Sequence, residues 1–306
     1  MVPLYVLGMI VLRTKIQTCM QQAKKRKKRG DHYMNTYIER ETVIVSGAEQ
    51  WEMYSDIGKR KYRIYISKPK QPAPDSGYPV IYVLDGNAYF QTFQEAMKVQ
   101  SGRAEKTGVP ASIIVGIGYP IEGVFAGAER CYDFTPYPLS VDAPPKPDGK
   151  PWPKSGGANK FLAFIQEELK PQIEKNFTIN PKKQTIFGHS FGGLFALHIL
   201  FTKVSAFQNY FICSPSIWWN NQLVLENQLK FIDKWSQMND EVRVFLTVGG
   251  AERGHMLQDA NALSERLSKL ENHKFQFAFY EAEGENHASV VPTVLSKGLR
   301  FVSNIL

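Results

Sequence analysis

The pentapeptide Gly188-His189-Ser190-Phe191-Gly192 decides the fold class of this 306-residue chain. It follows the apolar run 184–187, which is typical of a buried strand, and precedes the apolar run 193–200, which is typical of a helix packed on a sheet. A G-x-S-x-G sequence in that setting is a nucleophile elbow, a strained strand-to-helix turn that lifts a serine hydroxyl above the sheet. The alternative is a glycine-rich turn with a solvated serine, and the flanking strand and helix disfavour it.

The composition supports a large buried core, because 43% of the residues are apolar and 12% are aromatic. The net charge of +8 belongs to one segment of the chain. Residues 1–30 carry eight lysines and arginines and no acidic residue, so residues 31–306 are neutral overall. We therefore expect no nucleic-acid partner for the domain itself.

Residues 1–33 are expected to form a disordered basic extension of a domain that spans 34–306. The apolar run 2–12 precedes the basic cluster 24–29, which is the reverse of a secretory signal. That run is also too short for a transmembrane helix. Three interpretations stay open: a surface-anchoring arm, a nucleic-acid-binding arm, or sequence upstream of a true start at Met34.

The three cysteines predict a reducing compartment. Cys19, Cys131 and Cys213 are odd in number and form no C-x-x-C pair. This favours free thiols in a cytoplasmic protein.

Short apolar runs alternate with helix-period segments along the chain. The segment 161–173 repeats apolar residues every four positions, with a kink expected at Pro171, and 291–302 predicts a terminal amphipathic helix. This alternation predicts one α/β domain with a mostly parallel, doubly wound sheet. The expected strands are 62–66, 78–84, 112–117, 184–187, 210–213, 242–248 and 275–280.

One segment interrupts this pattern. Residues 131–155 contain seven prolines and show no clear period. A long loop inside a compact domain is usually functional or disordered, so we expect a lid or rim over the site, with a simple surface excursion as the alternative.

Ser190 needs a base within hydrogen-bond reach, and the serine, acid, histidine order of hydrolases places that base late in the chain. His287 follows the last predicted strand, at the edge where a parallel sheet assembles its site. It is the expected base. His255 is the less favoured candidate.

The expected acid is Glu252, which follows the strand 242–248 and so lies at the same edge. Glu283 and Glu285 are nearer to His287 in sequence. They are more typical of solvated loop charges, but they remain open.

Two backbone N–H groups are expected to bind the oxyanion. One is that of Phe191, directly after the nucleophile, and the other is that of Asn87, after the strand 78–84. No cofactor is predicted, because the chain has no Walker loop and no H-E-x-x-H zinc motif, and Gly116-Ile117-Gly118 lacks the third glycine of a dinucleotide site.

From about Asn35 to Leu306 the chain resembles the esterase-D-like branch of the α/β hydrolases, and within it the siderophore trilactone esterases. This resemblance implies Ser190 as nucleophile, His287 as base, Arg130 as a substrate contact, and a metal-independent serine esterase that acts on ferric tri-catecholates. Some members of the branch work as a Ser–His pair, which leaves Glu252 open. The motifs are Val83–Phe90, Ile114–Pro120, Arg130 with Asp133–Pro136, Gly188–Gly193, Ser214–Trp219 and Glu285–His287.

The chemistry of such a substrate suggests further contacts. A ferric tris-catecholate is a bulky trianion with aromatic rings, so Arg130 and Arg103 are candidates to meet its charge. Trp218 and Trp219 are candidates to stack on catechols, against the alternative that they are core residues.

The sequence leaves two rival functions open. One is a general carboxylesterase, or an esterase for acyl or feruloyl groups on carbohydrates. The other is a catalytically silent hydrolase fold that serves as a binding protein, which the intact Ser190 and His287 pair disfavours.

Overall fold

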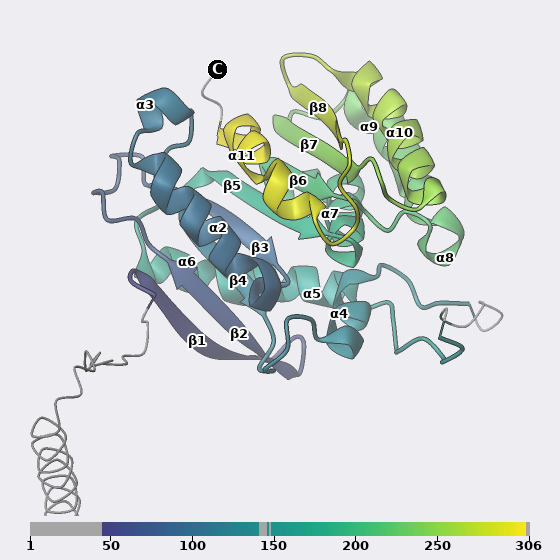
Figure 1. The fold of residues 1–306 in the computed structure, drawn as a ribbon, viewed down its shortest axis with the longest axis horizontal. Helices are drawn as coiled ribbons and strands as arrows, with labels where there is room; N and C mark the ends of the chain where they lie inside the picture. Colours follow the sequence, from purple (N-terminus) through teal and green to yellow (C-terminus); the bar gives the residue numbers. More distant parts are fainter. Residues whose placement is uncertain (1–44, 141–145, 147, 304–306) are drawn as a thin grey trace, which may run out of the picture. The chain divides into compact units, whose positions relative to one another are not determined.

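The computed structural model describes residues 45–140, 146 and 148–303, and within them eight strands form one sheet in the order β1-β2-β4-β3-β5-β6-β7-β8 (Figure 1). Pairing is antiparallel between β1, β2 and β4 and parallel between all other neighbours. The mostly parallel α/β-hydrolase sheet predicted from the sequence is confirmed. The strands are β1 (Ala48–Ser55), β2 (Arg60–Ser67), β3 (Tyr78–Leu84), β4 (Ile113–Gly118), β5 (Ile179–His189), β6 (Asn209–Cys213), β7 (Val242–Gly249) and β8 (Phe275–Ala282).

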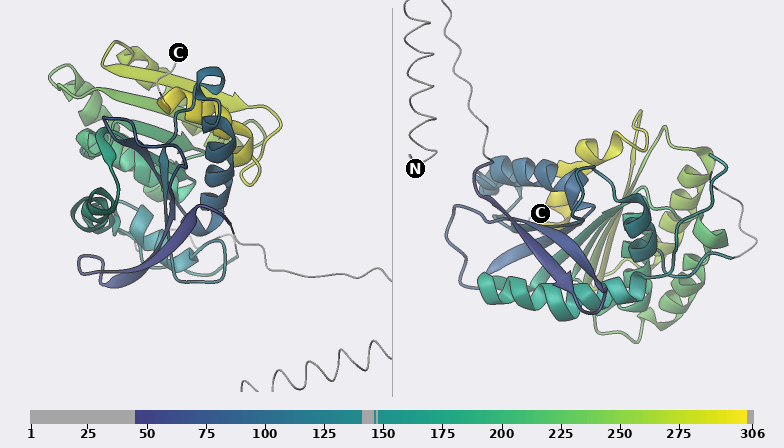
Figure 2. Two further views of the ribbon diagram at one scale, coloured as in Figure 1. Left: turned by 90° about the vertical axis from the view of Figure 1, so that its left-hand side faces the viewer. Right: turned by 90° about the horizontal axis from the view of Figure 1, so that it is seen from below.

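Helices cover both faces of the sheet (Figures 1 and 2). Helices α2 (Gly86–Ser101) and α11 (Val290–Ser303) pack on one face, where Phe93 and Leu295 belong to one apolar cluster. Strands β4 and β6 are buried along their whole length, which explains their mostly apolar sequences. The opposite face is covered by α4 (Gly127–Phe134), α5 (Ala158–Ala163), η1 (Phe164–Leu169), α6 (Lys170–Asn176), α7 (Phe191–Thr202), α9 (Val224–Trp235) and α10 (Gly254–Leu267).

Short elements complete the connections between these helices and strands. They are α3 (Ala104–Thr107), η2 (Val204–Ala206), α8 (Trp219–Gln222) and η3 (Ser268–Leu270). No helix among the described residues combines the length and apolar character needed to cross a bilayer.

The predicted kink at Pro171 takes the form of a π-helical turn. Proline lacks an amide hydrogen and its ring collides with the carbonyl four residues earlier, so the helix widens at η1 before it continues as α6. A residue of this π-helical turn also contacts the β1–β2 turn: Glu168 Oε1 accepts hydrogen bonds from the Asp56 and Ile57 amides at 2.9 and 3.0 Å. These bonds hold the β1–β2 turn against the helix.

Part of the predicted proline-rich segment 131–155 is helical. Its first four residues belong to α4, so the irregular stretch begins at Thr135. Its two ends are joined at the base, where Thr135 Oγ1 accepts from the Gly156 amide at 2.8 Å and Ser155 Oγ accepts from the Leu139 amide at 2.9 Å. The role of this rim segment as a lid stays a prediction, and the expected extension 1–33 lies outside the described residues.

Candidate active site

Ser190 lies in the sharp turn between β5 and α7. Its φ of 60° and ψ of −119° form a conformation that L-residues rarely adopt. A Cβ atom on Gly188 would lie 2.1 Å from the Gly192 carbonyl oxygen, so the turn can form only with glycine there. The Ser190 carbonyl accepts hydrogen bonds from the amides of Leu194 and Ser216 at 3.0 and 3.1 Å. The backbone is therefore held in its strained form from two sides.

The structure places His287 against Glu252. His287 Nδ1 lies 2.9 and 3.1 Å from the two carboxylate oxygens of Glu252. A carboxylate only accepts hydrogen bonds, so Nδ1 is the donor, and in a neutral imidazole with this tautomer Nε2 is the acceptor. The Glu252 side chain is 1% exposed, whereas that of His287 is 41% exposed. The arrangement thus consists of a buried acid that orients a histidine whose other side reaches solvent.

The loop after β7 is bonded to the loop after β8, which brings acid and histidine together. The Gly250 amide donates to Ala282 O at 2.7 Å and the Ala251 amide donates to Glu285 O at 2.9 Å. A Cβ atom on Gly249 would lie 2.3 Å from the Glu285 carbonyl oxygen. The Gly249-Gly250 pair therefore permits the close approach that positions Glu252.

The other candidates for acid and base are engaged elsewhere or exposed. Glu285 Oε1 accepts from Thr293 Oγ1 at 2.8 Å, and Glu283 is exposed to solvent. His255 is exposed at the start of α10. Among the described residues, the Ser190 hydroxyl has Ser216 Oγ as its hydrogen-bond partner, at 3.4 Å. A serine–histidine hydrogen bond is often formed only in the substrate complex.

The two residues predicted to bind the oxyanion, Phe191 and Asn87, lie at the N-termini of two helices. Phe191 is the first residue of α7 and Asn87 the second of α2, positions at which an amide has no acceptor within its own helix. The Asn87 side chain anchors its helix to the end of β4, with Oδ1 accepting from the Tyr119 amide at 2.8 Å and Nδ2 donating to Tyr119 O at 3.0 Å. A Cβ atom on Gly118 would lie 2.2 Å from Asn87 Oδ1, so the anchor needs glycine there.

This geometry agrees with what the chain resembles. The esterase family model, described as "Putative esterase", matches residues 55–290. The chain belongs to this esterase family. It is 45% identical to the ferri-bacillibactin esterase BesA of Bacillus subtilis (strain 168), over 84% of this chain and 90% of that relative. It is 36% identical to a siderophore enterobactin esterase of Emericella nidulans, over 74% of this chain and 82% of that relative. The crystal structure of the BES protein from Bacillus cereus matches with a TM-score of 0.84 and 67% identity, over 88% of this chain and all of that one (100%).

In the esterase, Arg130 on α4 is bound to Asp85. Its Nε and Nη2 donate to the two Asp85 oxygens at 2.9 and 2.8 Å, and the two side chains are 13% and 1% exposed. The guanidinium also lies over the rings of Phe125 and Phe191, at 5.3 and 5.5 Å. Two of its five N–H groups are thus used by Asp85.

The two predicted tryptophans have different environments. Trp219 is 2% exposed and packs edge-on against Phe191 at 4.9 Å, so it is a core residue that cannot stack on a substrate as it stands. Trp218 is half-buried, 6.1 Å from Phe191. The sequence did not single out Trp152, which the rim segment places 6.0 Å from Trp218 and 6.1 Å from Phe191.

The structure does not bring Arg103 to this site. Helix α2, which carries Asn87 in its first turn, is 16 residues long, which is about 24 Å. Arg103 follows its far end and is exposed there. The helix length thus carries Arg103 away from the carboxyl edge of the sheet, and the expectation that it meets the substrate stays a prediction that this placement does not favour.

Two other contacts at the site were not predicted. His189 packs its ring on that of His287, with 4.4 Å between centroids, and its Nδ1 lies 3.0 Å from Tyr89 Oη. Tyr89 lies in the motif Val83–Phe90 and His189 in the pentapeptide 188–192, but nothing in the sequence shows that α2, β5 and the β8–α11 loop meet.

The esterase's described thiols take no part in this arrangement. Cys131 and Cys213 are free and buried. Burial raises the pKa of Cys131 to about 11 and that of Cys213 further, so both stay protonated. Residues 45–140, 146 and 148–303 contain no cluster of three or more His, Cys, Asp or Glu side chains placed to hold a metal ion.

Proposed function

We propose that this esterase hydrolyses the ester bonds of a tri-catecholate siderophore trilactone, ferri-bacillibactin or ferric enterobactin, through Ser190, and thereby releases iron. The observation that carries the proposal is the 45% identity to a ferri-bacillibactin esterase over 90% of that relative. The hydrogen-bonded Glu252–His287 pair and the strained Ser190 supply a chemical means to do so.

The proposed reaction is acyl transfer in two steps. Ser190 Oγ attacks an ester carbonyl carbon while its proton passes to His287 Nε2, and Glu252 stabilises the resulting imidazolium. The amides of Phe191 and Asn87 donate to the oxyanion, each contributing about 3–4 kcal/mol to transition-state stabilisation. Collapse breaks the C–O bond, and the alkoxide leaves with the proton from His287. A water molecule, deprotonated by His287, then hydrolyses the acyl-enzyme and regenerates Ser190.

The substrate's charge and rings have matching groups near this chemistry. The three remaining N–H groups of Arg130 can meet catecholate oxygens, since a guanidinium binds anions without losing its own charge. Trp218, half-buried and next to Phe191, offers the aromatic face for a catechol ring. Trp219 supports that face from the core.

The test is chromatographic product analysis of ferri-bacillibactin and ferric enterobactin mixed with the enzyme, with Ser190→Ala as the control. Stepwise appearance of linear trimer, dimer and monomer, with the wild type only, is the expected result. An intact trilactone alongside turnover of a simple aryl acetate would replace the substrate by that of a general carboxylesterase. Labelling by a fluorophosphonate probe separates both from a silent binding protein, because only an activated serine reacts.

We also propose a cytoplasmic location for the protein. Cys131 and Cys213 are free thiols rather than disulfide partners. Free thiols are the rule in reducing compartments, whereas disulfides persist in oxidising ones. Fractionation of cells that express the native gene, with immunodetection of the esterase, checks this location.

A further inference from the structure

His189 is a buried titratable side chain that the proposed mechanism leaves without a role. It is the last residue of β5, directly before the nucleophile, and only 4% exposed. Its ring lies on the ring of His287, with centroids 4.4 Å apart and planes inclined by 43°. The second histidine of the site thus supports the exposed base from the core side.

Tyr89 holds His189 in this position. Its hydroxyl lies 3.0 Å from His189 Nδ1, and its ring packs edge-on against His189 and Phe187, at 5.7 Å from each. Tyr89 belongs to the first turn of α2, the helix that also presents the Asn87 amide. The contact therefore links α2, the nucleophile elbow and the loop that carries the base.

The surroundings keep His189 uncharged. Burial, and after it the neighbouring His287 and Arg130, lower the pKa of His189 to about 3. A neutral ring beside His287 adds no repulsion when His287 becomes an imidazolium, whereas a cation at 4.4 Å would oppose it. His189 thus contacts the His287 ring without placing a second positive charge beside it.

The Glu252 hydrogen bond alone does not fix the plane of the His287 ring. It anchors one edge, at Nδ1, and a ring held at one atom can still turn about that bond. A second contact on the ring face restricts this motion and directs Nε2 toward the serine. General-base catalysis depends on this direction, because the base nitrogen must lie within about 3 Å of the oxygen whose proton it takes.

We propose that His189, held by Tyr89, is a positioning residue for the base: it supports one face of the His287 imidazole and leaves the developing positive charge unopposed. The inference depends on the proposed serine mechanism, since it assigns His189 a role only if His287 is the base. It concerns the direction of the imidazole and is independent of which ester is cleaved, so an aryl acetate can serve as the probe.

The experiment compares His189→Ala, His189→Phe and Tyr89→Phe with the wild type. Active sites are titrated with a fluorophosphonate, and kcat and kcat/KM are measured against pH on an aryl acetate. For His189→Ala we expect the fluorophosphonate to titrate all active sites, as in the wild type. The kcat should be lowered about 30-fold with KM nearly unchanged, and the acid limb of the pH profile of kcat/KM should be displaced from that of the wild type. His189→Phe keeps a neutral ring at the same place and should recover most of kcat. Tyr89→Phe should give an intermediate loss.

His198 supplies a matched control. It is also buried, at 2% exposure, burial lowers its pKa to about 4, and its Nε2 is hydrogen-bonded to Asn159 Oδ1 at 2.9 Å, but it lies within α7 rather than against the base. His198→Gln should leave kcat and the pH profile within about twofold of the wild type.

Three results would overturn the proposal. A kcat loss in His189→Ala that matches a loss of titratable sites would show a structural role only. Unchanged kcat and pH profiles in all three variants would show no role, and Tyr89→Phe, which removes a single hydroxyl, keeps this test available if His189→Ala does not fold. A wild type that neither labels nor turns over ester would contradict the proposed function first, and the inference with it.

Discussion

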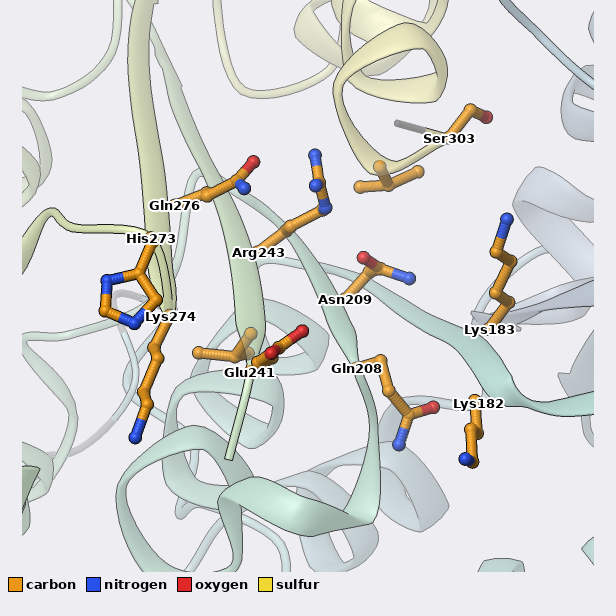
Figure 3. Close-up of a pocket in the computed structure, with 12 residues that line it drawn as sticks. Lys182, Lys183, Gln208, Asn209, Glu241, Arg243, His273, Lys274, Gln276 and Ser303 are labelled. Carbon is orange, nitrogen blue, oxygen red and sulfur yellow. The ribbon is translucent and has the colours of Figure 1, made fainter. Parts of the chain in front are cut away.

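The two ends of the parallel strands hold their polar groups in different ways. At the carboxyl end, β3, β5 and β6 are each followed by a non-glycine residue in a positive-φ conformation: Asp85 at 51°, Ser190 at 60° and Ser214 at 41°. At the amino end, a cleft of about 210 Å³ opens beside β5, β6, β7 and β8, with Arg243 directed toward the end of α11 (Figure 3). Its charged lining is Lys182, Lys183, Glu241, Arg243 and Lys274, with His273 beside them.

Both ends carry charged side chains, and they differ in whether those side chains are buried and held by a partner. At the carboxyl end, Glu252 is 1% exposed and bound to His287, and Asp85 is 1% exposed and bound to Arg130. At the amino end, Lys182, Lys183 and Glu241 are exposed, so solvent screens them and their side chains are free to rotate. Catalysis requires groups held in advance of the reaction, so a cleft with a charged lining is not by itself the better candidate for an active site.

The largest effect is expected at Ser190, where strain and chemistry coincide. Ser190→Ala and Ser190→Gly should both lose about 10⁵- to 10⁶-fold in kcat. Ser190→Gly should be the more stable to unfolding by about 1 kcal/mol, because glycine adopts the φ of 60° without a steric penalty. Ester turnover and urea unfolding measure the two quantities. Equal stability of the two variants would show that the elbow stores no strain.

The next effect separates Glu252 from its neighbours in sequence. Glu252→Gln should lower kcat by about 10³- to 10⁴-fold, because the amide no longer stabilises the imidazolium or fixes its tautomer. The matched control is Glu283→Gln, which removes an exposed carboxylate from the adjoining loop and should change kcat less than twofold. Comparable losses of kcat in the two variants would show that the catalytic acid cannot be assigned to Glu252 alone. No loss in either variant would favour a Ser–His pair.

The sequence predicted the buried part of the sheet well, because burial leaves a readable pattern. The strand expected over 78–84 is β3 to the residue, and the runs 210–213 and 242–248 fall one residue short of β6 and β7. Strand β1 was not predicted. It lies at the sheet edge and only its last residue, Ser55, is buried, so no apolar run marks it.

The positions of site residues could be predicted where the sheet topology fixes them. Contacts between side chains of different elements could not be predicted. Residues that follow parallel strands share one edge, which is why Ser190, Glu252 and His287 lie together. No such rule places Tyr89 against His189, since that contact depends on how α2 packs. The position of Arg103 could not be predicted either, because it follows a helix whose length the sequence does not fix.

A smaller effect concerns a buried charge on α4, the helix that carries Arg130. Burial raises the pKa of Asp133 to about 6, and the charge of Arg60 and the hydroxyls of Tyr62 and Tyr119 only partly oppose this. The folded state therefore binds the proton more tightly than the unfolded chain, whose Asp pKa is about 3.9. The contribution of Asp133 to stability should rise by about 1–3 kcal/mol as the pH falls from 7 to 4.

Asp133→Asn isolates that contribution. Urea unfolding of both proteins at pH 7.5 and pH 4.5 gives two stability differences, and the wild type should gain more on acidification than the variant. Comparing the gain of the wild type with that of the variant removes the pH dependence that all other titratable groups contribute to both proteins. A variant with the same gain would show that Asp133 is ionised in the folded protein at both pH values.

The smallest effect is expected at the amino end, and it tests the contrast between the two ends directly. Arg243 lies six residues before Gly249 along β7, which is about 20 Å and more than twice the Debye length of about 8 Å at physiological ionic strength. Removing its charge in Arg243→Gln should therefore change kcat and KM on an aryl acetate by less than twofold at 0.15 M salt. Lys183→Gln, on the opposite wall of the cleft, should behave alike (Figure 3). A loss above about fivefold in either variant that persists at 0.5 M salt cannot be a screened field effect. It would mean that the strands transmit a packing change from one end to the other, and the amino end would then be part of the enzyme's working structure.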